Sequence, residues 1–68
     1  MSYYVKRRKF EWLAPSWTGP IRASKQADKE ASAWRDAGWL ADVIPSSVSV
    51  RREVNAWQRQ RNLERASA

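Results

Sequence analysis

Arginine, asparagine and glutamine side chains recur through the stretch RREVNAWQRQRNLER, residues 51–65. Arginine forms paired hydrogen bonds with phosphate groups and with guanine, and asparagine and glutamine form such pairs with adenine. The chemistry that these residue types support is therefore recognition of a polyanion by hydrogen bonding and charge.

Residues in an α-helix project about 100° apart, and on this spacing the stretch divides into two sides. Val50, Val54 and Trp57 form an apolar stripe. The other side is an arc of roughly 140° that contains only Arg, Asn and Gln, while Glu53 and Glu64 lie outside it. An ordinary solvated face mixes charges of both signs, so this pattern leaves two interpretations open, a solvated face and a binding face.

A second cluster, Lys6 to Lys9, lies beside aromatic residues near the N-terminus. Cations among aromatic side chains are suited to a nucleic-acid backbone, although positive charge also protects the edge of a strand from aggregation. From the two clusters together we predict a set of nucleic-acid contacts: Lys6, Arg7, Arg8, Arg51, Arg52, Asn55, Arg59 and Asn62.

Catalytic, metal-binding and cofactor-binding patterns are missing from the sequence. There is no Cys or His, the seven acidic residues are scattered, and two glycines are too few for a phosphate-binding loop. We therefore predict a protein that is not an enzyme and has no cofactor and no metal site.

The length of 68 residues suits one domain, residues 1–68, with a C-terminus that frays from about residue 64. The net charge of +6 favours nucleic acid or an acidic host protein as the partner. No apolar run approaches the roughly 18 residues of a membrane span, so we expect a cytoplasmic protein without membrane contact.

Local patterns predict five elements: strands at residues 2–11, 17–22 and 39–44, and helices at residues 24–37 and 50–63. Ser24 is the expected N-cap of the first helix, and Gly38 the left-handed residue that ends it. The order β-β-α-β-α predicts a small two-layer α+β domain, a three-stranded sheet with both helices on one face. Whether the third strand lies beside the first or beside the second stays open.

Five tryptophans are available to a small core. Trp34, Trp39 and Trp57 are predicted core residues, and Trp17 is expected to be buried. For Trp12 the sequence favours neither burial nor exposure.

The segments YYVKRR, WTGPIRASKQADKEASAWRDAGW and VRREVNAWQ resemble the small single-domain accessory proteins encoded by phages of actinobacteria. This resemblance implies a protein that acts in the host cytoplasm on DNA or on a host protein.

Two functions follow as hypotheses. The first is non-enzymatic binding of double-stranded DNA by the C-terminal helix and the N-terminal basic strand. The second is a protein-interaction module, a homodimer or a modulator of a host protein, anchored by an exposed Trp12, Trp17 or Tyr4 with arginines around it.

Overall fold

A computed structural model describes residues 1–67 of the chain. Its elements are β1 (Tyr3–Arg8), β2 (Ser16–Ile21), α1 (Ser24–Asp36), β3 (Leu40–Pro45) and α2 (Val48–Ser67). The predicted order and the α+β class are confirmed. The first strand is shorter than expected, and α2 continues to Ser67, beyond the point near Leu63 where we expected regular helix to end.

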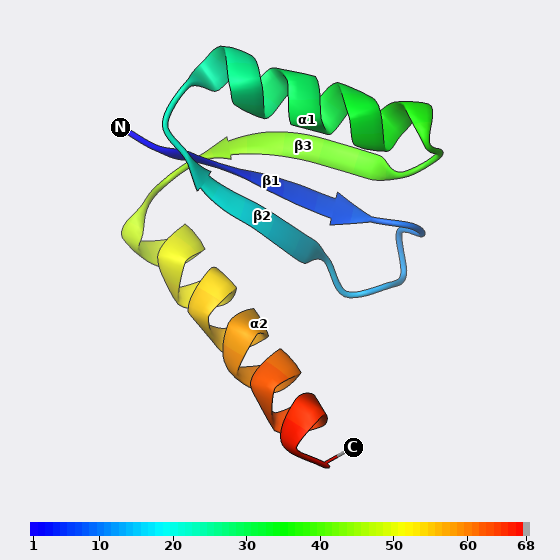
Figure 1. Ribbon diagram of the computed structural model, residues 1–68, viewed down its shortest axis with the longest axis vertical. Coiled ribbons are helices and arrows are strands. Elements are labelled where there is room, and N and C mark those ends of the chain that lie inside the picture. Colours follow the sequence, from blue (N-terminus) through cyan, green and yellow to red (C-terminus); the bar gives the residue numbers. More distant parts are fainter. Residues whose placement is uncertain (68) are drawn as a thin grey trace.

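The three strands form one sheet in the order β2-β1-β3, with β1 antiparallel to both neighbours. The third strand therefore lies beside the first, which decides between the arrangements that the sequence left open. Since β2 and β3 run in the same direction on either side of β1, α1 connects them by crossing over the central strand (Figure 1).

The two helices cover opposite faces of the sheet, so the predicted placement of both on one face is wrong (Figure 1). Val5 packs with Ala27 of α1, whereas the preceding residue, Tyr4, packs with Trp17 and with Val54 of α2. Successive strand residues point to opposite faces. Both faces of β1 therefore carry a buried apolar side chain, and each face needs its own helix.

Helix α1 packs closely over β1 and β3 because Ala27 and Ala31, both fully buried, present only a methyl group to the sheet. Ala23, in an extended conformation and without a side-chain cap, takes the N-cap place that we predicted for Ser24. At the other end Gly38 has a φ of +91°, as predicted.

A Schellman motif closes α1. The Trp39 N–H donates to the Trp34 carbonyl at 3.0 Å, and the Gly38 N–H donates to the Arg35 carbonyl at 2.9 Å. The two indole rings meet edge to face, with centroids 5.0 Å apart. This is the apolar contact that commonly accompanies the motif, and it fixes the turn into β3.

Helix α2 begins after Ser47, whose hydroxyl accepts a hydrogen bond from the Val50 N–H at 3.2 Å. Its apolar contacts with the sheet come from Val50, Val54 and Trp57, all in its first half. The 20-residue helix is about 30 Å long, and its second half extends away from the sheet (Figure 1). Within residues 1–67, neither helix combines the length and hydropathy that a bilayer crossing requires.

Strand β2 contains a bulge that makes room for Tyr4. Tyr3 pairs with Ile21 and Val5 with Thr18, so two residues of β2 lie opposite Tyr4. One of them, Gly19, has a φ of +139°, and a Cβ there would lie 2.9 Å from both the Tyr3 carbonyl oxygen and a ring carbon of Tyr4. A side chain at this position would collide with the central strand.

We expect Gly19→Ala to lower the free energy of unfolding by about 3 kcal/mol, because a strained φ and a steric collision add together. The matched control is Gly38→Ala, where φ is also positive but no atom lies within 4 Å of the added Cβ. It should cost only about 1 kcal/mol. Urea denaturation measures both, and equal losses would contradict the collision at Gly19.

Candidate nucleic-acid interface

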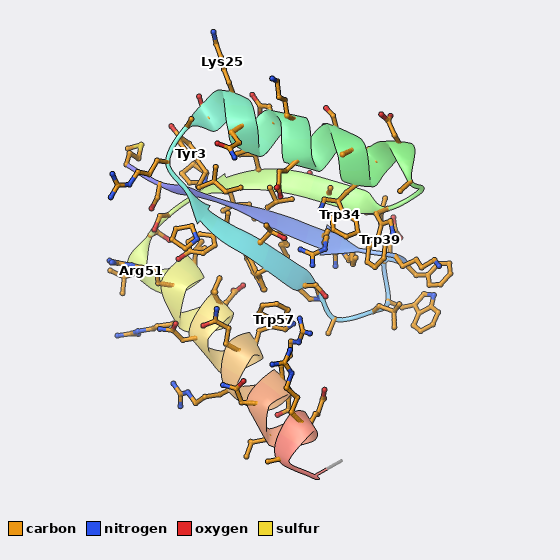
Figure 2. The ribbon with its side chains drawn as sticks, viewed as in Figure 1. Tyr3, Lys25, Trp34, Trp39, Arg51 and Trp57 are labelled. Atoms are coloured by element: carbon orange, nitrogen blue, oxygen red, sulfur yellow. The ribbon has the colours of Figure 1, made fainter. Side chains whose placement is uncertain are left out.

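The predicted contact residues of α2 lie on the surface. Arg51, Arg52, Asn55, Arg59 and Asn62 are all exposed. Arg51 points away from the sheet, and Trp57 points toward it (Figure 2). The helix therefore presents the Arg, Asn and Gln arc to solvent and its apolar stripe to β2, as the helical periodicity predicts.

Arg61 is an exposed basic residue that the sequence interpretation left out. On a helical wheel it falls on the apolar stripe, between Val54 and Trp57, where a sheet would be expected to cover it. Because α2 has already left the sheet at this point, Arg61 is exposed, and its guanidinium stacks on the Trp57 ring at 5.0 Å. Identifying Arg61 as an exposed residue would have required knowing where the sheet ends, and no local sequence pattern gives that information.

A shallow hollow of about 320 Å³ runs along this side of α2. Its lining contains two guanidiniums, two amides and an indole, and no carboxylate: Trp57, Gln58, Arg61, Asn62 and Arg65. The hollow is therefore positively charged and rich in hydrogen-bond donors.

The two helical layers differ in charge. Helix α2 has five arginines and two glutamates, whereas α1 has three cations and three carboxylates. Glu53 and Glu64 are not three or four residues from Arg51, Arg52 or Arg59, the spacings at which helical side chains pair. Positive charge is thus concentrated on one side of the sheet and is not offset within the arc.

The N-terminal cluster is divided by the alternation of β1. Lys6 lies on the α2 side, with its Nζ 5.6 Å from the Trp17 ring centroid, and Arg8 alternates to the same side. Arg7 lies on the α1 side, where its guanidinium stacks on the Trp34 ring at 4.3 Å. The strand therefore offers two of its three predicted contact residues to the face that carries α2.

Arg7 makes contacts that bind elements of the fold together. Its guanidinium donates a hydrogen bond to the Thr18 hydroxyl of β2 while it packs on Trp34 of α1. Partial burial lowers the pKa of Arg7 from its ordinary value, the carboxylate of Glu30 acts in the opposite direction, and the positive charge of Arg61 lowers it further. These contacts give Arg7 a structural role.

The eight predicted contact residues thus form three groups rather than one surface. Five lie on the exposed arc of α2, Lys6 and Arg8 lie on the same side of the sheet as that helix, and Arg7 lies on the opposite face.

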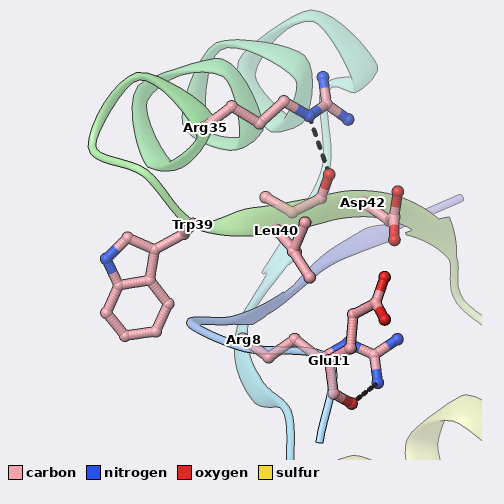
Figure 3. A pocket seen from close by; sticks show the side chains of 7 residues that line it. Arg8, Glu11, Arg35, Trp39, Leu40 and Asp42 are labelled. Atoms are coloured by element: carbon pink, nitrogen blue, oxygen red, sulfur yellow. Dashed lines mark hydrogen bonds between the residues drawn. The ribbon is translucent and has the colours of Figure 1, made fainter. Parts of the chain in front are cut away.

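A second hollow, of about 580 Å³, lies where β1 and β3 meet the loop after β1 (Figure 3). Arg8 and Arg35 contribute positive charge, and Glu11 and Asp42 contribute negative charge. Arg35 already donates from Nε to the Ala41 carbonyl at 2.9 Å. Since the charges offset each other here, the hollow is a poorer site for a polyanion than the surface of α2.

The tryptophans occupy three kinds of environment. Trp17 is buried, at 5% exposure, as expected, and Trp12 is 78% exposed. The predicted core residues Trp34, Trp39 and Trp57 are half-buried instead: Trp34 and Trp57 lie at the margins of the two apolar clusters, and Trp39 packs on the Trp34 ring. The core proper is therefore built from Tyr4, Trp17 and small aliphatic side chains.

Within residues 1–67, no group of three or more acidic residues is placed to hold a metal ion. Comparisons of the chain with protein-family models, with curated proteins and with solved structures found no match.

The two arginines at the end of β1 should respond differently to substitution. Arg7→Ala removes a ring contact and a hydrogen bond, so we expect a loss of about 1 to 2 kcal/mol in the free energy of unfolding. The Arg8 side chain donates a long, 3.4 Å hydrogen bond to the Glu11 carbonyl, so Arg8→Ala should cost less than about 0.5 kcal/mol. Thermal and urea denaturation measure both variants, and equal stabilities would show that Arg7 does not join the layers.

Proposed function

We propose that this protein is a non-enzymatic binder of double-stranded DNA that places α2 in the major groove. The observation that carries the proposal is the second half of α2, which extends beyond the sheet with Arg, Asn and Gln exposed around it. The major groove, about 12 Å wide, admits one α-helix. A helix that stands clear of the body of its domain can enter the groove without a clash.

The positions of the side chains around α2 suit the major groove, which is bordered by one phosphate backbone on each side. Arg52 and Arg59 project about 80° to 100° to one side of Arg51, and Arg61 projects about 80° to the other. Asn55 and Asn62 lie between these flanks. Arginines on the flanks are placed for the two phosphate backbones, and the amides between them for base edges.

Lys6 and Arg8 extend the flank on which Arg61 lies. They share the α2 side of the sheet, and Arg61 stacks on Trp57, which packs against the apolar cluster on that side. A phosphate backbone that passes between Arg61 and the sheet would meet these two cations. We assign them to phosphate contact and leave Arg7 out of the interface.

The resemblance to accessory proteins of actinobacterial phages favours the host cytoplasm as the place of action and host or phage DNA as the target. The alternative, a protein-interaction module, loses two of its three proposed anchors because Tyr4 and Trp17 are buried. Trp12, which is exposed, is the third anchor and is still available to this alternative.

Fluorescence anisotropy of a labelled duplex tests the proposal. At about 50 mM salt we expect micromolar or tighter binding, with a steep loss toward 200 mM salt. Arg52→Ala combined with Arg59→Ala should weaken binding by about tenfold or more and reduce the slope of log affinity against log salt by about 2, because two phosphate contacts are lost.

The matched control is Lys25→Ala combined with Lys29→Ala on the neutral α1 layer, which removes the same charge from exposed positions. It should leave affinity within about twofold and the salt slope nearly unchanged. If both double variants lose affinity equally, only net charge matters and α2 is not the contact surface.

A further inference from the structure

The loop between β1 and β2 displays two stacked aromatic rings to solvent. Phe10 and Trp12 lie parallel, with an interplanar angle of 1° and centroids 5.3 Å apart, while 48% of Phe10 and 78% of Trp12 is exposed. Within residues 1–67, Phe10 supplies the only ring or cation found against the Trp12 indole. The stack is therefore open on the side of Trp12 that Phe10 does not cover.

Hydrogen bonds hold this loop in a turn. The Leu13 N–H donates to the Phe10 carbonyl at 3.1 Å, and the Arg8 guanidinium donates to the Glu11 carbonyl at 3.4 Å. The two aromatic residues thus leave the backbone from a closed turn, which limits the conformational freedom lost when a further ring is added to the stack.

The surroundings of the stack are charged. Arg8 and Lys9 precede Phe10, and Glu11 separates the two aromatic residues. Leu13, 38% exposed, is the other large apolar side chain of the turn. A docking site for a protein surrounds its aromatic anchor with a ring of water-excluding contacts, whereas a site for single-stranded nucleic acid combines exposed aromatic planes with nearby cations.

We infer that Trp12 is a stacking platform for an unpaired nucleobase, with Arg8 and Lys9 placed for the adjoining phosphates. The inference extends the proposed function to single-stranded or locally opened DNA, and rests on it only for DNA as the ligand. A base lying on Trp12 would continue the plane-parallel stack that Phe10 begins. Because every base has a π face, the site would be tolerant of sequence.

The first experiment measures anisotropy of a labelled twelve-nucleotide oligothymidylate and of a matched duplex. Trp12→Ala should weaken binding of the single strand by about tenfold, the size of one lost base stack, and leave duplex binding within about twofold. Trp12→Phe, which keeps a planar ring, should restore most of the single-strand affinity. Leu13→Ala is the matched control in the same turn and should change neither affinity.

A second readout follows the contact itself. A single strand containing iododeoxyuridine, irradiated in complex with the full chain, should cross-link to the peptide that contains Trp12. If Trp12 had a purely structural role, the single strand would not cross-link to this peptide. Trp12→Ala would then leave the ratio of single-strand to duplex affinity unchanged. Circular dichroism of each variant verifies that the fold is retained.

The outcomes separate this inference from the proposed function. Loss of duplex binding in the Arg52 and Arg59 variant, with single-strand binding unchanged in Trp12→Ala, would overturn the stacking platform and leave the α2 interface standing. The reverse pattern would overturn the α2 interface alone. If Trp12→Ala leaves both affinities unchanged and abolishes self-association in sedimentation, the stack is a contact between copies of the chain and the inference is wrong.

Discussion

Burial of two neighbouring side chains on opposite faces of β1 is the constraint on which the rest of the structure depends. Tyr4 is 7% exposed and Val5 is fully buried. Because adjacent strand residues point in opposite directions, one helix cannot cover both. Val5 lies under α1, Tyr4 lies over α2, and the antiparallel neighbours of β1 supply the remaining walls of the two apolar clusters.

The same alternation divides the basic end of β1. A run of consecutive cations looks like one patch in the sequence, but neighbouring members of it contact different layers. Arg7 lies beneath α1 and joins three elements, while Lys6 lies against Trp17 on the α2 side of the sheet. A residue of the proposed interface and a side chain that stabilises the fold are therefore adjacent in the sequence, which explains why the cluster could not be treated as a unit.

Local chemistry was sufficient to predict the elements and much of α2. Gly38 predicts the end of α1, and the apolar stripe of Val50, Val54 and Trp57 predicts that the Arg-rich arc faces solvent. Local patterns could not predict which face of the sheet α2 covers, because an apolar stripe of this kind can pack on either face. The exposure of Arg61 was also out of reach, because it depends on where the sheet ends beneath the helix.

Helix–sheet–helix layering with one neutral and one basic helix makes the molecule an electric dipole across its sheet. Fields of this kind act over about 10 Å at 0.1 M salt, a distance comparable to one layer of the protein. A polyanion approaching in solution would turn the domain so that α2 leads, before any side chain makes contact. In the proposed function, the three apolar residues that hold α2 against β2 would thus also orient the molecule toward a polyanion at first encounter.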